Sequence, residues 1–513
     1  MFKEAVGGGA RPPEAPAAAA PSGPPRRSPA ALRGLAELAR AHRLLVIALA
    51  LAAAVRLVTT LGYRPAVLFK LDSFDYLWGA THLAPDPVNT SGYSLFLRLL
   101  LPFHSLALVA VSQHLLGLVL AVLVYAVLLR SGVRQRVAVL ASLPVLFGAG
   151  QLLLEQLIMA DLLAMATMTA SLLVLLARQR PSVLRSAVAG LLMGVSVVIR
   201  PTALPLIAVL AVYLLIQRRG WRQAGAVLLA GAVPVLGYVA WFAASAGPVN
   251  LTNSNGMFLW SRTMSFADCA VIRPPADLRA LCPTAQPGVL GQPDPARRPL
   301  PKIYLWTHTA WQWQGKPAAV GLVPDTAAFT VASNARAQRF AILAIEAQPL
   351  SYARVVASEL VHPLLTGTGF DFPVTQPHTA SLVPASNRTY ALASIRGYAG
   401  STAGIGNDLG HHLGARLDQP YASLIGAYQK IITLPGALVG LLLAAGLAGL
   451  LSPRRRNWPA ALLWVSAVIT IVLPVAEHEY TYRYVVPAIP LACMAAALCF
   501  GVPPRAAGAS PRP

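Results

Sequence analysis

The sequence predicts an all-α polytopic membrane protein with about ten transmembrane helices and a large extracytoplasmic loop domain. Of its 513 residues, 56% are hydrophobic and only 12% are charged, which departs strongly from the composition of soluble domains. Apolar runs of about 17 to 25 residues recur, each long enough to cross a hydrocarbon core of about 30 Å as a helix. Because backbone polar groups in lipid must pair internally and no barrel-like alternation is present, helices are the expected spanning elements.

The apolar runs divide the chain into five segments. The first is rich in Ala, Pro and Gly and lacks periodicity, which predicts disorder. The segments are a disordered basic cytoplasmic tail at 1–43, spans one to seven at 44–245, an extracytoplasmic loop domain at 246–429, spans eight to ten at 430–500 and a cytoplasmic tail at 501–513. Within the loop domain, apolar residues at helical spacing mix with charges, which predicts two surface helices broken at Pro349.

Basic residues predict the orientation of the chain. With the N-terminus inside, every second loop should be basic, and the alternation holds. These loops carry Arg130, Arg134 and Arg136; Arg178, Arg180 and Arg185; Arg218, Arg219 and Arg222; and Arg454, Arg455 and Arg456. The net charge of +22 therefore indicates topology and contact with anionic membrane lipids, not nucleic acid, for which no binding motif is present. High usage of Ala, Arg and Pro is typical of GC-rich bacterial genomes, so we expect a bacterial cytoplasmic (plasma) membrane with both termini cytoplasmic.

The expected first outer loop, 62–104, contains the acids Asp72, Asp75 and Asp86. Asp72 and Asp75 are three residues apart, so a helix places both carboxylates on one face, with Tyr76 beside them. A carboxylate at the membrane surface can act as general base for an acceptor hydroxyl. The alternative is an amphipathic juxtamembrane helix with a solvated acidic face, which the spacing alone favours.

Two further acids lie around the expected turn between the third and fourth spans. Glu155 and Asp161 are in or near apolar runs, where an acid is costly and usually has a partner or a function. Asp161 fits the N-cap of the next span equally well. Glu155 lies deeper in its apolar run, which favours a functional role.

Cations on the outer face are exceptions to the positive-inside pattern, and a phosphate site needs them. The exceptions are Arg200, Arg262, Arg483 and Lys302. Arg200 lies at an expected outer hairpin, where an arginine can snorkel to lipid headgroups or bind a phosphate bidentately.

The last outer loop, AEHEYTYRYVVPAIPL, carries Tyr482 beside Arg483. Its aromatic residues in part resemble an ordinary interfacial belt. Glu477, His478 and Glu479 could ligate a divalent cation, but adjacent residues do not all face one point, so no metal is predicted.

Of the four cysteines, two share the long outer segment. A Cys269–Cys282 disulfide is expected if that segment faces an oxidising compartment. The other two, Cys493 and Cys499, lie in an apolar run and are expected to be packing residues.

Four segments resemble elements of the GT-C superfamily of polyprenyl-phosphate-sugar-dependent glycosyltransferases, which includes protein O-mannosyltransferases and lipid A aminoarabinose transferases. They are DSFDYLWGA, SGYSLFLRLL, VVIRPTAL and YRYVVPAIPL. Of these, SGYSLFLRLL resembles the turn that opens the next span in the family. The chain departs from the family at Ser73, where many relatives carry Glu, so an adjacent two-acid dyad is absent.

The resemblance implies a GT-C-like fold and an inverting transfer on the outer face of the membrane. The donor would be a polyprenyl-phosphate-sugar, and the acceptor a hydroxyl of a glycan, protein, lipid or metabolite. Asp72 would be the catalytic base, with Asp75 beside it, and Arg200 and Arg483 would contact the lipid phosphate. The remaining candidates for substrate binding are Tyr76, Glu155, Asp161 and Tyr482. No cofactor beyond the lipid-linked donor is implied.

Two alternatives stay open. A secondary transporter or flippase of a lipid-linked or small polar substrate would predict inverted repeats, broken helices and acids at the bilayer midplane. A non-catalytic membrane scaffold would leave the Asp72 region unexplained. Walker, dinucleotide-binding, HExxH and GxSxG motifs are absent in a suitable context, which argues against nucleotide-driven pumping and soluble-type hydrolase chemistry.

Overall fold

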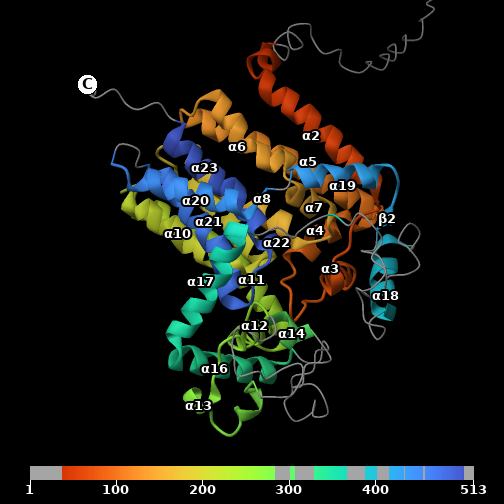
Figure 1. Cartoon of the computed structure of the whole chain (residues 1–513), viewed down its shortest axis with the longest axis vertical. Helices are drawn as coiled ribbons and strands as arrows, with labels where there is room; N and C mark the ends of the chain where they lie inside the picture. Colours follow the sequence, from red (N-terminus) through yellow and green to blue (C-terminus); the bar gives the residue numbers. More distant parts are fainter. Residues whose placement is uncertain are drawn as a thin grey trace, which may run out of the picture. The chain divides into compact units, whose positions relative to one another are not determined.

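The computed structural model of the chain is built almost entirely of helices (Figure 1). It describes residues 37–283, 301–306, 329–366, 372, 388–400, 415–432, 434–453 and 457–501; the expected tails lie largely outside these residues. The chain divides into two compact units, Met1–Ile47 and Ala48–Pro513. The first unit contributes the start of helix α2, and the second holds every later element.

Five described helical segments are long and apolar enough to cross a membrane, or up to eight if each bent helix pair is one span. The five are α2 (Arg43–Gly62), α5 (Leu106–Arg130), α11 (Trp221–Ala246), α21 (Trp458–Glu477) and the run Tyr482–Phe500, which contains α22 (Tyr482–Val485), η7 (Val486–Ala488) and α23 (Ile489–Phe500). Exposed Leu229, Val233 and Leu236 follow one another at helical spacing on α11, as expected of a face that contacts lipid. The predicted all-α polytopic membrane class is confirmed.

The bent pairs and the shorter helices account for the difference from the expected number of spans. The pairs are α6 (Gln135–Phe147) with α7 (Ala149–Gln156), α16 (Val331–Ala347) with α17 (Pro349–Thr366), and α19 (Tyr421–Ile432) with α20 (Gly436–Leu451). The shorter helices α8 (Ala160–Leu176), α9 (Val183–Ile199) and α10 (Leu204–Ile216) correspond to runs that were expected to span separately. Between α9 and α10 the helix breaks at Arg200, and Pro201 begins the short η2 (Pro201–Ala203).

The segment expected to be the first outer loop folds into two short helices, α3 (Lys70–His82) and α4 (Gly92–Leu100), followed by η1 (Leu101–Phe103). The segment SGYSLFLRLL therefore forms a helix of its own and does not open the second span. Its helical run ends at His104, in a left-handed conformation, and α5 starts afresh with the Ser105 hydroxyl accepting from the Leu108 amide. The helix α18 (Arg388–Ala399) lies beside α3 (Figure 1).

Short strand pairings hold the start of this loop. Strand β1 (Tyr63–Arg64) pairs antiparallel with β2 (Arg416–Leu417), with Tyr63 opposite Leu417. A single parallel bridge joins Val67 to Leu157. The loop before α3 is thereby fixed to the loop between α7 and α8.

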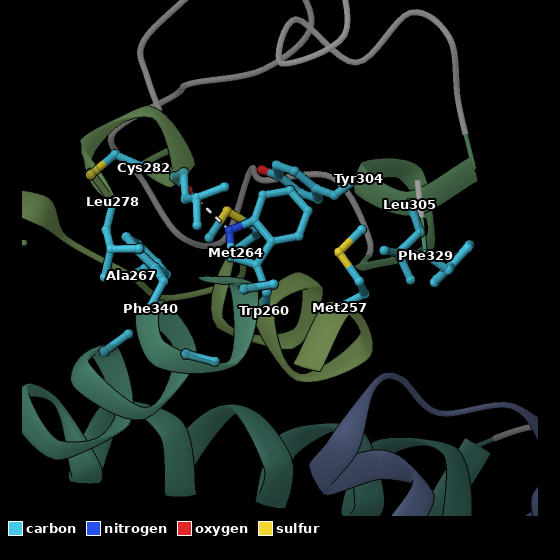
Figure 2. Packing of buried hydrophobic residues seen from close by; sticks show 14 residues of the cluster. Met257, Trp260, Met264, Ala267, Leu278, Cys282, Tyr304, Leu305, Phe329 and Phe340 are labelled. Atoms are coloured by element: carbon cyan, nitrogen blue, oxygen red, sulfur yellow. Dashed lines mark hydrogen bonds between the residues drawn. The ribbon is translucent and has the colours of Figure 1, made fainter. Parts of the chain in front are cut away.

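The long segment 246–429, expected to be extracytoplasmic, contains a packed core of its own (Figure 2). Its described helices include α12 (Asn255–Thr263), α13 (Cys269–Ile272), η3 (Arg279–Leu281), α14 (Pro301–Trp306) and α16. The indole of Trp260 is buried at the centre, donates to the Leu281 carbonyl at 3.1 Å and meets the Tyr304 ring edge-on. A disulfide joins Cys269 to Cys282, and α16 and α17 meet at 99° just before Pro349.

Helices α9 and α11 cross at close range because small residues line the crossing. Gly190 and Gly194 of α9 face Val227 and Gly231 of α11, a spacing of four residues typical of tightly packed membrane helices. A Cβ atom on Gly194 would lie 2.2 Å from the Gly231 carbonyl oxygen, so the backbones would have to separate.

We predict that Gly194→Ala lowers the stability of the protein by about 1–3 kcal/mol, because it overpacks this crossing. Thermal unfolding in detergent or nanodiscs measures the change. The matched control is Gly237→Ala on α11, where an added Cβ meets no atom within 4 Å. Equal melting temperatures for the two variants would contradict the prediction.

Candidate active site

Four charged side chains from four separate segments form a continuous ionic chain. Nη1 of Arg483 in α22 lies 3.3 Å from Oδ2 of Asp72 in α3, and its Nε lies 4.0 Å from Oδ1 of Asp161 in α8. The other oxygen of Asp161 accepts a 2.6 Å bond from Nη2 of Arg200, the residue that ends α9. The fold therefore brings together four of the residues that the sequence singled out, separated by up to 411 positions.

The members of this ionic chain differ in exposure. The side chain of Asp161 is 1% exposed and that of Arg483 is 9% exposed, whereas Arg200 is 21% and Asp72 is 30% exposed. A carboxylate as enclosed as Asp161 acts chiefly as counter-ion to the two guanidinium groups. Asp72 is the carboxylate that a substrate can reach.

The structure decides between the two interpretations of Asp161. The N-cap of α8 is Met159, and it makes no side-chain capping bond. Asp161 lies in the first helical turn, where a negative charge is favourable near the helix N-terminus. Its carboxylate is directed to the arginines, so the N-cap alternative is wrong.

Aromatic rings frame the two arginines. The guanidinium carbon of Arg483 lies 5.1 Å from the centre of the Tyr484 ring and 4.7 Å from that of Phe69. Arg200 lies over the same tyrosine at 5.4 Å, and Arg483 donates to the Tyr484 hydroxyl at 3.1 Å. Such contacts hold the guanidinium planes in place without neutralising their charge.

The two arginines still have unused donors. The Nε atoms of Arg200 and Arg483 are buried and have no hydrogen-bond partner within the described structure. A buried donor without a partner costs free energy, and the cost is removed when an acceptor binds. The arginines therefore fit a site that an anionic ligand completes.

A small cavity of about 30 Å³ adjoins this ionic chain. Asp161, Arg200 and Tyr484 line one part of it, and Met165 and Met168 of α8 are among the apolar residues that line the rest. The cavity is far smaller than a ligand pocket of about 300 Å³ or more, so it marks the place where the ionic chain borders the apolar helices.

Asp75 lies outside the ionic chain. Its Oδ1 accepts a 3.1 Å bond from the Tyr390 hydroxyl of α18, 315 positions away. Burial raises the pKa of the Asp75 carboxyl well above its ordinary value, and the charges of Asp86 and Asp72 raise it further. Asp75 therefore gains a proton more readily than an ordinary carboxylate.

Asp86 and Tyr76 both make hydrogen bonds within the segment expected to be the first outer loop. Oδ1 of Asp86 accepts from the amides of Val88 and Asn89, at 2.8 and 2.6 Å, but burial still raises the pKa of Asp86 to about 6. Tyr76 donates to the Asn89 side chain at 3.3 Å and is almost fully buried. The ring of Tyr76 thus packs within the loop; a contact with substrate stays a prediction.

Glu155 belongs to a second, separate ionic cluster. One carboxylate oxygen accepts from Arg56 at 2.8 Å and from Gln151 at 2.9 Å, and the other is bonded to His114 at 2.8 Å. Arg56, His114 and Glu155 itself are buried. Gly117 lies so close that a Cβ atom there would be 1.9 Å from the carboxylate. This enclosure leaves Glu155 no room for a substrate, so we reassign it to a structural role.

The remaining candidates have structural contacts. Tyr482 is buried and donates to the Leu434 carbonyl at 2.5 Å. The His478 ring is bonded to the Ser261 hydroxyl at 2.9 Å. Among the described residues, no group of three or more His, Cys, Asp or Glu side chains could hold a metal ion, and this includes Glu477, His478 and Glu479.

Several residues at the site were not predicted. Tyr484 and Phe69 frame the arginines, and Tyr390 holds Asp75 from a distant helix. Ser73 accepts from the Phe69 amide and donates to the Ile158 carbonyl, both at 2.8 Å. Only Tyr484 had a usable signal, as an aromatic residue directly beside a candidate arginine.

Comparisons with known proteins give little beyond this geometry. No protein-family model matches the sequence, and no curated protein matches it. A structural match is the crystal structure of the Archaeoglobus fulgidus oligosaccharyltransferase tethered to an acceptor peptide, at 12% identity and a TM-score of 0.39. The match covers 88% of this chain and 49% of that one, so this chain spans about half the length of the matched protein. A likeness at this TM-score supports no conclusion about function.

We predict that either Arg56→Met or Glu155→Leu alone costs about 3–5 kcal/mol of stability, because each leaves a buried charge without its partner. The double variant removes both charges and should cost much less than the sum of the two. Chemical or thermal unfolding of the three variants gives the coupling energy. Additive costs would show that the pair is not a unit.

We predict a pH-dependent difference in stability between wild type and Asp86→Asn. The folded state keeps the Asp86 proton up to about pH 6, whereas the unfolded state loses it near pH 3.8, so this group makes wild-type stability fall as pH rises through that window. The melting temperature of Asp86→Asn relative to wild type should therefore increase from pH 4 to pH 7. A constant or decreasing difference would contradict the raised pKa.

Proposed function

We propose that the protein is a membrane glycosyltransferase that moves a sugar from a polyprenyl-phosphate carrier to an acceptor hydroxyl on the outer face of the membrane. The observation that carries the proposal is the position of Arg483, between the exposed carboxylate of Asp72 and the buried carboxylate of Asp161. A reachable base and a charged phosphate site are the two groups that such a transfer requires.

The arginines supply the phosphate site. Arg200 and Arg483 lie close to the same carboxylate and the same aromatic ring, with unused buried donors. Guanidinium groups bind phosphate oxygens with two parallel hydrogen bonds, which orients the leaving group. Of the two carboxylates beside Arg483, Asp72 is 30% exposed and Asp161 is 1% exposed, so an incoming phosphate displaces Asp72 more readily.

The freed Asp72 is then the base. Its carboxylate takes the proton of the acceptor hydroxyl while the acceptor oxygen forms a bond to the anomeric carbon. The bond from that carbon to the phosphate oxygen breaks, and its electron pair leaves with the polyprenyl phosphate. Arg200 and Arg483 stabilise the second negative charge that develops on the phosphate. Attack opposite the leaving group inverts the anomeric carbon and requires no covalent intermediate.

Asp161 and Asp75 have other roles in this mechanism. Asp161 stays with the arginines and keeps them fixed when Asp72 leaves. Asp75 is bonded to Tyr390 and gains a proton readily, so we assign the base to Asp72 alone.

The carrier lipid fits the apolar surroundings of the site. The apolar lining of the adjoining cavity comes from membrane-type helices, including Met165 and Met168 of α8. A polyprenyl chain can approach there from the bilayer while its phosphate meets the arginines. We place this site on the outer face of a bacterial plasma membrane, with both termini cytoplasmic, because of the distribution of basic loops.

A transporter or flippase is the second candidate, and one observation favours it. Arg56, His114 and Glu155 form a buried ionic cluster within apolar helices, the kind of feature that marks substrate or proton pathways in transporters. Both carboxylate oxygens of Glu155 are bonded within the cluster and its side chains are enclosed, which favours a structural role.

We predict that Asp72→Asn lowers sugar transfer by about 100- to 10,000-fold, because it removes the general base but keeps the shape of the side chain. Arg483→Lys should lower kcat/KM for the donor about 10- to 100-fold, because it loses the bidentate contact. The measurement is transfer of radiolabelled sugar from synthetic polyprenyl-phosphate donors by the purified protein in nanodiscs.

The matched control is Asp277→Asn, which changes an exposed outer acid paired with exposed Arg339. It should leave transfer unchanged. If wild type neither binds nor consumes any such donor, the glycosyltransferase proposal fails and transport of the same lipids is measured instead.

A further inference from the structure

The turn that leads into Arg483 is held by helices of the outer segment. This turn, Ala476–Tyr480, links the end of α21 to α22. Its Ala476 carbonyl accepts a 3.0 Å bond from the Tyr352 hydroxyl of α17. The His478 ring is bonded to Ser261 of α12 and meets the Phe258 ring edge-on. Side chains of two outer helices thus contact the turn from both ends.

An ion pair between the same two helices also binds the turn. We call this pair, Arg262 with Glu359, the clamp. Arg262 of α12 donates to both oxygens of Glu359 of α17, at 2.7 and 2.8 Å. The same guanidinium donates to the His478 carbonyl at 3.0 Å, and the Tyr480 amide donates to Glu359 at 3.0 Å. The pair therefore binds one backbone acceptor and one backbone donor of the turn.

Besides Glu359 and the turn, Arg262 donates to the Ser265 hydroxyl at 3.1 Å. The side chain is fully enclosed, so it is not the outer-face phosphate ligand that its place in the sequence allowed. A two-oxygen contact between charged groups is among the strongest side-chain interactions, and it is rigid because both partners have fixed geometry. Arg262 also sits on α12, whose neighbouring Trp260 and Met257 belong to the packed core of the outer segment (Figure 2).

Only Thr481 and Tyr482 separate the clamped Tyr480 from Arg483. The intervening chain is itself ordered, because the Tyr484 amide bonds to the Thr481 carbonyl and Tyr482 bonds to Leu434. A displacement of the turn would therefore move the start of α22 and the arginine on it.

We propose that Arg262 and Glu359 are positioning residues, which fix the turn Ala476–Tyr480 and thereby hold the Arg483 guanidinium against Asp72 and Asp161. The consequence for catalysis rests on the proposed function, but the clamp itself does not. The role of α12 and α17 is then to set the geometry of the phosphate site from the outer segment.

The clamp is tested by hydrogen–deuterium exchange of the full-length protein in nanodiscs. Glu359→Gln keeps the size of the side chain and removes its charge. We expect exchange in peptides covering 478–485 to become about 10-fold faster, because the Tyr480 amide loses a charge-assisted bond. The control, Asp277→Asn, breaks an exposed ion pair of the same outer segment and should leave these peptides unchanged.

Unchanged exchange at 478–485 in Glu359→Gln would overturn the clamp. If Glu359→Gln does not fold, Tyr352→Phe decides the matter, since it removes only the hydroxyl that bonds Ala476. That variant should show a smaller acceleration confined to the same peptides, and no acceleration would overturn the proposal.

A double-mutant cycle tests whether the clamp acts through Arg483. Glu359→Gln should lower kcat/KM for the donor about 10-fold in wild type, chiefly through a higher KM, but less than about 2-fold in an Arg483→Lys background. Equal losses in both backgrounds would show that the clamp does not position Arg483. If wild type consumes no donor, the proposed function fails, while the exchange result still decides the clamp.

Discussion

The site depends on the burial of Arg483 beside Asp161. A guanidinium taken out of water costs several kcal/mol unless a counter-ion and hydrogen bonds replace the solvent. Asp161 supplies that counter-ion to Arg483 and to Arg200 at once, so α8, α9 and α22 must converge for any of the three charges to be tolerated. Asp72 of α3 contacts Arg483 at the more exposed end of the ionic chain. The ionic chain therefore defines where the helices meet as well as where chemistry can occur.

The buried cluster around Glu155 is a purely structural counterpart of this ionic chain. Glu155 has both carboxylate oxygens bonded, and Arg56 donates to two backbone carbonyls besides Glu155. In contrast, the Asp72–Arg483 end is partly exposed: the side chain of Asp72 is 30% exposed, whereas that of Glu155 is fully buried. A buried arginine Nε without a partner in the described structure occurs in both clusters, so the exposure of one carboxylate separates the two. The clusters are joined mechanically, since the segment after Glu155 pairs with Val67 and holds Ser73, the neighbour of Asp72.

Asp72, Arg200 and Arg483 could be singled out from the sequence because each breaks a local rule, an acid pair after a span or an outer-face cation. What the sequence could not show is pairing across long separations. Arg56 stands in the sequence as one charge in an apolar run, and its partner is 99 positions away. The position of Asp161 in the sequence fits a helix N-cap, and only the tertiary structure shows that its carboxylate instead binds Arg200. The number of spans differs for the same reason, because a helix break such as that at Gly148, where α6 and α7 meet at 48°, depends on packing.

Two carboxylates lie beside Arg483 although the protein has Ser73, not an acid, next to Asp72. The Ser73 hydroxyl is buried and tied to the Ile158 carbonyl, so its side chain fixes the loop and does not enter the ionic chain. The second carboxylate comes instead from Asp161, on another helix. This division matters in the proposed mechanism, because a phosphate can displace the more exposed Asp72 while the buried Asp161 stays beside the arginine. Two adjacent acids on α3 would move together, whereas acids on separate helices can serve as mobile base and fixed counter-ion.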